Sequence, residues 1–233
     1  MAGIDRPRAR RHRPLNRRPV FSDRTDAGRQ LAAELTGLAS EHPIIYALPR
    51  GGVPVAIEVA RALGAPLDLL IVRKIGAPGY PEVALGAVAD GADPLLVVNQ
   101  DVYAATGRDA AGLERARQRE LAEIDRRRRR YMGDRPPIDP FGSTAIVVDD
   151  GLATGATARV ATAHLRQQDA ARVILAVPVA PADRVADMRN EGDEIVVVHA
   201  PMQFWAIGQF YTDFHQLSDE ETIALLQSIW SET

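Results

Sequence analysis

The chain has 233 residues, a formal net charge of −3 and no cysteine. A chain of this length buries one substantial core, and 46% hydrophobic with 25% charged residues is ordinary for a globular protein. The lack of cysteine excludes disulfides and thiolate zinc sites. The first residues contain no apolar core of a signal peptide, and no apolar run in the chain approaches the length of a membrane span, so we expect a cytoplasmic protein without a membrane partner.

Residues 1–18 form a basic N-terminal segment. Seven arginines and one aspartate lie between Asp5 and Arg18, with almost no large apolar side chains, a composition typical of a disordered tail. Such a tail could contact nucleic acid or another polyanion, but composition alone favours a solvated terminus. We therefore expect no nucleic-acid partner.

Residues 19–233 alternate apolar runs with helix-like stretches, which predicts a single domain. The expected strands are Ile44–Leu48, Leu67–Val72, Ala145–Val148, Val173–Val179 and Ile195–Val198, and the expected helices are Asp26–Leu38, Val53–Leu63, Ala156–Gln168 and Pro181–Arg189. Near-continuous apolar strands are typical of a parallel sheet buried on both faces. The alternation predicts an α/β fold with a central, mainly parallel sheet flanked by helices, and ligands at the carboxyl ends of the strands.

Two expected loops carry glycines or cations. The first strand leads into Arg50, Gly51 and Gly52, where the glycines suit either a plain β-turn or the close approach of an anion. The second strand leads into Arg73 and Lys74, and Lys74 is the only lysine of the chain. Successive strand residues point to opposite faces, so we expect one of the two cations to reach a ligand, unless Lys74 is a plain surface residue.

Residues 76–82 have the glycine and proline density of a mobile loop. After it, Leu85–Ala89 and Leu95–Val98 are short enough to form an extra strand pair, which could act as a flap. A helix expected at Asp109–Tyr131 carries the arginine run Arg126–Arg130. Acidic residues three or four positions earlier and the helix dipole explain these arginines without a nucleic-acid-binding face.

The segment Ala145–Thr157 is the most informative part of the chain. An apolar strand ends in Asp149 and Asp150 and continues into a helix through a loop with the residues Gly151, Leu152, Ala153, Thr154, Gly155, Ala156 and Thr157. Carboxylates suit sugar hydroxyls or a hydrated divalent metal, and backbone N–H groups at a helix N-terminus suit phosphate. The alternative is a strand-to-helix turn whose Asp pair only caps the helix, since Asp and Thr are favoured there, but it leaves the repulsion of two adjacent carboxylates unexplained.

The strand, acidic pair and Gly/Thr loop at Val147–Thr157 resemble the signature of type I phosphoribosyltransferases, which bind 5-phospho-α-D-ribose 1-diphosphate (PRPP). The resemblance implies that Asp149 and Asp150 face the ribose hydroxyls and that residues 151–157 hold the 5-phosphate. It further implies phosphoribosyl transfer to a nitrogen of a nucleobase-like heterocyclic acceptor, with release of pyrophosphate. Mg²⁺ is expected to arrive with PRPP and to meet Asp149 and Asp150 directly or through water.

The same resemblance assigns roles to the other loops. Arg50, Gly51 and Gly52 look like the pyrophosphate loop of the family, where we expect a cis peptide between Arg50 and Gly51. Arg73 and Lys74 stand where family members place a basic residue against pyrophosphate. Residues 76–82 correspond to the flexible catalytic loop that closes over PRPP and excludes water. Within that loop, Glu82 is a candidate for proton transfer or else a solvated carboxylate.

The acceptor is expected under a small hood, built from about residues 19–26 and 200–216. Phe204, Trp205 and Tyr211 could stack on a heterocycle there, or pack the hood or a dimer contact instead. Enzymes of the family that act on 6-oxopurines usually carry an aspartate at the position of Ala153. Alanine is typical of the adenine enzymes, so hypoxanthine and guanine are disfavoured, although adenine does not follow.

Two alternatives to a transferase stay open on the sequence. A sensor would bind PRPP or a nucleotide without turnover, and a hydrolase would transfer the ribose phosphate to water. The five histidines show no ligand spacing, so no zinc site is expected. The sequence also leaves homodimerisation open.

Overall fold

The computed structural model describes residues 19–77, 80–90, 94–106, 110–190 and 194–231, so the basic tail at residues 1–18 lies outside the described residues. Five strands form the central sheet: β1 (Ile44–Ala47), β2 (Leu67–Leu69), β6 (Thr144–Val148), β7 (Arg172–Val179) and β8 (Glu194–His199). Their order is β2-β1-β6-β7-β8, and each neighbouring pair is parallel. The predicted parallel sheet is confirmed.

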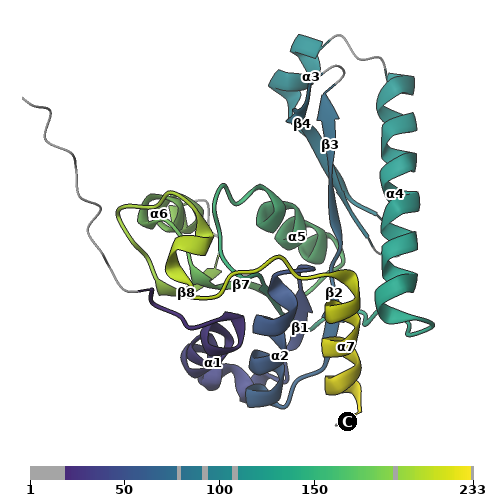
Figure 1. Cartoon of the computed structure of the whole chain (residues 1–233). Helices are drawn as coiled ribbons and strands as arrows, with labels where there is room; N and C mark the ends of the chain where they lie inside the picture. Colours follow the sequence, from purple (N-terminus) through teal and green to yellow (C-terminus); the bar gives the residue numbers. More distant parts are fainter. Residues whose placement is uncertain (1–18, 78–79, 91–93, 107–109, 191–193, 232–233) are drawn as a thin grey trace, which may run out of the picture.

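Helices cover both faces of this sheet (Figure 1). They are α1 (Arg24–Leu35), α2 (Gly52–Leu63), α5 (Ala156–Gln167), α6 (Ala182–Asn190) and α7 (Asp219–Trp230), with short 3-10 helices η1 (Thr36–Glu41) and η2 (Ile207–Phe210). Because strand side chains alternate, Ile45 and Ile146 pack with α1, α2 and α7, whereas Ile44 and Val147 pack with α5 and α6. No helix in the described part of the chain is long and apolar enough to cross a membrane.

A second unit, which we call the arm, projects from the central sheet (Figure 1). It consists of β3 (Val72–Ala77), β4 (Tyr80–Ala89), β5 (Leu96–Val98), α3 (Gln100–Thr106) and α4 (Ala110–Met132). The three strands form an antiparallel sheet in the order β3-β4-β5. The extra strand pair expected from the sequence is confirmed, while the single strand expected at Leu67–Val72 is divided between the two sheets.

The expected mobile loop at residues 76–82 needs correction. Gly76 and Ala77 belong to β3, and Tyr80 begins β4 directly opposite Ala77, while residues 78–79 lie outside the description. The strand register shifts on both sides of Gly76. An irregularity of this kind accommodates glycine in a strand, so the described residues on either side of positions 78–79 belong to two paired antiparallel strands.

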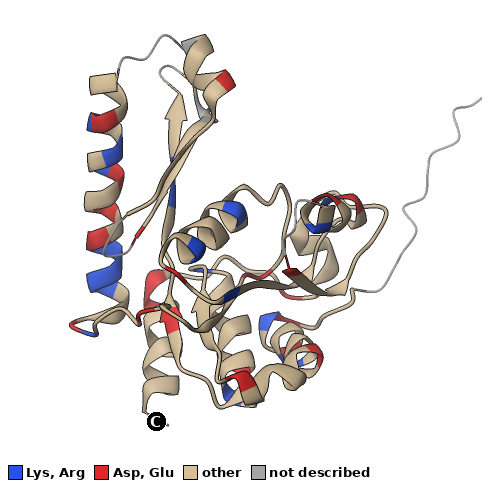
Figure 2. Cartoon of the chain, turned by 180° about the vertical axis from the view of Figure 1, so that it is seen from behind, with Lys and Arg blue, Asp and Glu red and all other residues tan. Residues whose placement is uncertain are grey.

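Arg128 of α4 ties the base of the arm to the central sheet. Its Nη2 donates to both carboxylate oxygens of Asp68, at 2.8 and 3.0 Å, and its Nη1 donates to Asp90 Oδ2 at 3.0 Å. Asp68 and Asp90 are both buried, and burial raises the pKa of Asp90 to about 6. Acidic and basic residues are mixed along α4, and the arginine run lies near its C-terminal end (Figure 2). Within that run, Arg128 is the residue that contacts the buried Asp68 and Asp90.

We expect Arg128→Met to lower the free energy of unfolding by about 3–5 kcal/mol, because it leaves two buried carboxylates without their cation. Urea denaturation of both proteins measures the difference. Arg129→Met is the matched control, since Arg129 is the exposed neighbour on the same helix. Equal stability of the two variants would contradict a structural role for the Arg128 cluster.

Candidate active site

The acidic pair follows β6 at the carboxyl edge of the sheet. Asp150 is buried and Asp149 is half-buried. The Asp150 carboxylate accepts a hydrogen bond from Arg24 Nε at 2.8 Å, and the backbone N–H of Asp150 donates to Asp149 Oδ1 at 2.8 Å. Burial raises the pKa of both carboxyl groups; the charge of Asp150 raises the pKa of Asp149 further, and Arg24 opposes these shifts. The site is therefore a mutually repelling pair of carboxylates with one built-in cation.

Arg24 is a site residue that sequence reasoning did not single out. It begins α1, whose N-cap Asp23 accepts a hydrogen bond from the Asp26 N–H. Its Nη1 donates to the His215 carbonyl at 2.9 Å, and its guanidinium carbon lies 3.9 Å from the centre of the Phe214 ring. A buried arginine fixed on three sides holds the Asp150 carboxylate in one orientation.

The loop after the acidic pair leads directly into α5. Gly155 is its N-cap with φ of 77°, a left-handed conformation that favours glycine. Leu152 is buried and its N–H donates to the Val179 carbonyl at 2.8 Å, so Leu152 anchors the loop. Ala153, Thr154 and Ala156 are exposed and present the loop to solvent.

The loop after β1 packs against the acidic pair. A Cβ atom on Gly51 would overlap the Asp150 carboxylate, and one on Gly52 would lie 2.5 Å from the Val148 carbonyl oxygen. Glycine is therefore required at both positions by close approach. The loop contains a cis peptide bond between Pro49 and Arg50, which corrects the expectation of a cis bond between Arg50 and Gly51.

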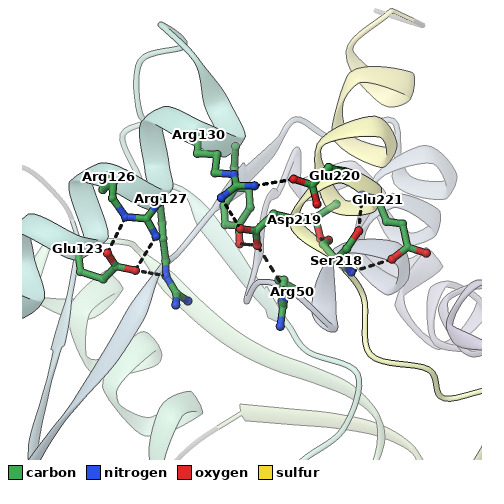
Figure 3. Close-up of polar contacts among 11 residues, drawn as sticks. Arg50, Glu123, Arg126, Arg127, Arg130, Ser218, Asp219, Glu220 and Glu221 are labelled. Atoms are coloured by element: carbon green, nitrogen blue, oxygen red, sulfur yellow. Dashed lines mark hydrogen bonds and ion pairs between the residues drawn. The ribbon is translucent and has the colours of Figure 1, made fainter.

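The side chain of Arg50 points toward the first turn of α7 (Figure 3). Arg50 Nη1 lies 3.5 Å from Asp219 Oδ1. The same carboxylate accepts a hydrogen bond from the Tyr131 hydroxyl at 2.6 Å and pairs with Arg130 Nη1 at 2.9 Å. Asp219 is thus a second neighbour of the site that local sequence patterns did not reveal.

Arg73 and Lys74 lie on β3 of the arm. Arg73 Nε donates to Glu120 Oε2 of α4 at 2.9 Å, so alternation places Lys74 on the opposite face of the strand. Lys74 is exposed, and in the described part of the chain it has no ion pair. Glu82 lies in β4, and its side chain is outside the description.

The three aromatic candidates occupy different surroundings. Tyr211 is buried, and its hydroxyl donates to the Asp150 carbonyl at 2.6 Å. The half-buried Phe204 packs on Phe210 with ring centres 5.4 Å apart. Trp205 is 89% exposed. Residues 20–22 also pair with residues 210–213, through hydrogen bonds such as Thr212 N–H to the Phe21 carbonyl, which brings the two expected hood segments side by side.

Comparison with known proteins identifies the family. Residues 23–214 match the family model of the phosphoribosyl transferase domain. The chain belongs to this family, which confirms the resemblance seen at Val147–Thr157.

Relatives of high similarity agree with this assignment. The crystal structure of TT1426 from Thermus thermophilus has 42% sequence identity and a TM-score of 0.76, and the match covers 89% of this chain and 98% of that one. Two Mycobacterium tuberculosis proteins, named "Putative phosphoribosyl transferase Rv0571c" and "Putative phosphoribosyl transferase MT0597", are each 47% identical over 207 residues. The match covers 89% of this chain and 46% of those proteins, so the chain spans about half of their length.

We expect Arg24→Met to lower the free energy of unfolding by about 3 kcal/mol, because Asp150 would stay buried without its cation. Chemical denaturation provides the measurement. Arg29→Met on the same helix is the control, since Arg29 forms an exposed pair with Glu58 and such pairs contribute about 0–1 kcal/mol. A loss no greater than that of the control would show that Arg24 does not stabilise the acidic pair.

Proposed function

We propose that the protein transfers the phosphoribosyl group of PRPP to a nitrogen of a nucleobase-like acceptor and releases pyrophosphate. One observation carries the proposal: the loops after β1 and β6 touch each other, with Gly51 against the Asp150 carboxylate. A diphosphate site and a ribose-phosphate site must adjoin in this way, because both groups belong to one PRPP molecule. The family match over residues 23–214 supports this reaction class.

In this proposal, the loop after β6 binds the ribose 5-phosphate half of PRPP. Asp149, the less buried residue of the pair, accepts hydrogen bonds from the ribose hydroxyls, together with Asp150, which Arg24 orients. Residues 153–157 hold the 5-phosphate at the N-terminus of α5, where backbone N–H groups and the helix dipole favour an anion. Gly151 and Leu152 shape the loop, the latter through its bond to Val179.

The loop after β1 binds the leaving group. Gly51 and Gly52 let the backbone approach the diphosphate, and Arg50 supplies a charged donor. Lys74 is a better candidate than Arg73 for a further cation, because Glu120 already neutralises Arg73. Positive charges held beside the diphosphate stabilise pyrophosphate as it leaves C1 of the ribose.

The residues present fit a magnesium ion that arrives with PRPP. No group of three or more acidic or histidine side chains in the described part of the chain forms a complete metal site. Two adjacent carboxylates at the carboxyl edge of the sheet suit a hard cation that keeps water and substrate oxygens as its other ligands. When bound, such an ion would neutralise diphosphate charge, while Asp149 and Asp150 would hold it directly or through water.

The acceptor side of the proposal rests on Trp205. Its exposed ring offers a face on which a heterocycle could stack, while Tyr211 is committed to the Asp150 carbonyl and Phe204 to Phe210. Glu82 on β4 stays our candidate for moving a proton to or from the acceptor base.

We expect Trp205→Ala to raise KM for the acceptor base about 10-fold and to leave KM for PRPP within about twofold, because stacking of one base contributes about 1–3 kcal/mol. Steady-state kinetics with either substrate varied measures both constants. Met202→Ala is the control, since Met202 is equally exposed on the same segment, at 90%. Matching KM values in the two variants would exclude Trp205 from the acceptor site.

The reaction itself is tested by magnesium-dependent pyrophosphate release from PRPP across a panel of purine and pyrimidine bases. We expect release with one base, and a loss of about 100-fold or more in kcat/KM for Asp149→Asn, because a charge that orients ribose or metal is removed. Asp187→Asn is the control, since Asp187 is an exposed aspartate on α6.

The other outcomes discriminate among functions. Calorimetric PRPP binding without pyrophosphate release would favour a sensor. Release that needs no base would indicate a hydrolase. Absence of PRPP binding in the wild type would contradict the proposed function.

A further inference from the structure

The first turn of the C-terminal helix α7 places a carboxylate beside the loop after β1, to which we assign the diphosphate. Asp219 is the first residue of α7, and it lies outside the family match at residues 23–214. Its Oδ1 is 3.5 Å from Arg50 Nη1 (Figure 3). A segment beyond the matched domain therefore contacts the cation that we assign to the diphosphate.

The Asp219 carboxylate is firmly placed. The Tyr131 hydroxyl donates to Oδ1 at 2.6 Å, and Arg130 Nη1 lies 2.9 Å from Oδ2. A capping box between Ser218 and Glu221 fixes the helix turn on which Asp219 stands. The Tyr131 hydrogen bond and the nearby arginines lower the pKa of Asp219, so the group is ionised at neutral pH.

The backbone of Arg50 is held by the hydrogen bonds of its loop, and its side chain is partly exposed. The Gly52 N–H donates to the Leu48 carbonyl, the Val53 N–H donates to the Arg50 carbonyl, and the loop abuts Asp150 through Gly51. Among the described residues, Asp219 is the ionic partner of Arg50, whose side chain is 32% exposed. Because one terminal nitrogen faces Asp219, the other guanidinium N–H groups are left for a ligand.

We propose that Asp219 is a positioning residue that holds Arg50 in place for the diphosphate group. The inference rests on the proposed function and adds to it a residue outside the family match. A long arginine side chain loses rotamer entropy when it is fixed, and fixing it before the ligand arrives removes part of that cost from binding.

The geometry indicates that Asp219 positions Arg50 and does not compete with the diphosphate for its charge. The Asp219 carboxylate already has two closer partners, Tyr131 and Arg130, and its contact with Arg50 is too long for a strong hydrogen bond. The positive charge of Arg50 is therefore only partly neutralised. A diphosphate can bind the free edge of the guanidinium while Asp219 stays on the other edge.

The test compares Asp219→Asn with Glu220→Gln. Both remove one negative charge from the first turn of α7, but Glu220 pairs with Arg130 and not with Arg50. We expect Asp219→Asn to raise the Kd for magnesium pyrophosphate, measured by calorimetry, and KM for PRPP about five- to tenfold, with kcat within about twofold. Glu220→Gln should change each constant less than about twofold, and Asp219→Glu should restore most of the affinity.

A second variant tests the inference in case Asp219→Asn does not fold. Tyr131→Phe keeps the ring and removes only the hydroxyl that fixes Asp219, and it should raise the Kd for magnesium pyrophosphate about two- to threefold. Binding as tight as wild type in Asp219→Asn, or in Tyr131→Phe where the first variant is unfolded, overturns the inference. A wild type that binds neither PRPP nor pyrophosphate overturns the proposed function instead, so the two failures are distinguishable.

Discussion

The contact between the Asp150 carboxylate and the backbone of Gly51 is the constraint on which the rest of the site depends. Strands β1 and β6 are neighbours in the sheet, so their loops emerge side by side. They come into contact because residue 51 has no side chain, and Gly52 likewise lies against the Val148 carbonyl. The acidic pair and the glycine turn are therefore one structural unit, and a side chain at either glycine would separate them.

Burying Asp150 beside Asp149 is unfavourable, and the surrounding residues offset that cost. Arg24 provides the opposite charge, and it is held by the His215 carbonyl and the Phe214 ring. The Tyr211 hydroxyl donates to the backbone of Asp150. Tyr211, which the sequence suggested as a base contact, therefore supports the acidic pair instead, together with Phe214 and His215. Such a supporting shell keeps a charged group in one orientation.

Local patterns in the sequence predicted the parallel sheet, the glycine turn at Arg50–Gly52 and the strand-loop-helix junction at Val147–Thr157. They could do so because strand burial and turn chemistry are encoded by adjacent residues. Arg24 and Asp150 are 126 positions apart, and no spacing rule links such a pair. The strand pairing of Gly76 and Ala77 with β4 was missed for a different reason: a register shift at Gly76 accommodates a residue that usually marks a loop.

The arginine run of α4 shows how one helix turn joins three parts of the molecule. Residues two positions apart on a helix point about 160° away from each other, so Arg128 reaches the buried Asp68 and Asp90 while Arg130 reaches Asp219 and Glu220. The arm is anchored to the sheet on one side of α4 and to α7 on the other. Asp219 lies between Arg130 and Arg50, so the position of α4 bears directly on the loop after β1. A displacement of the base of the arm must therefore alter the surroundings of Arg50, which links the arm physically to the candidate diphosphate site.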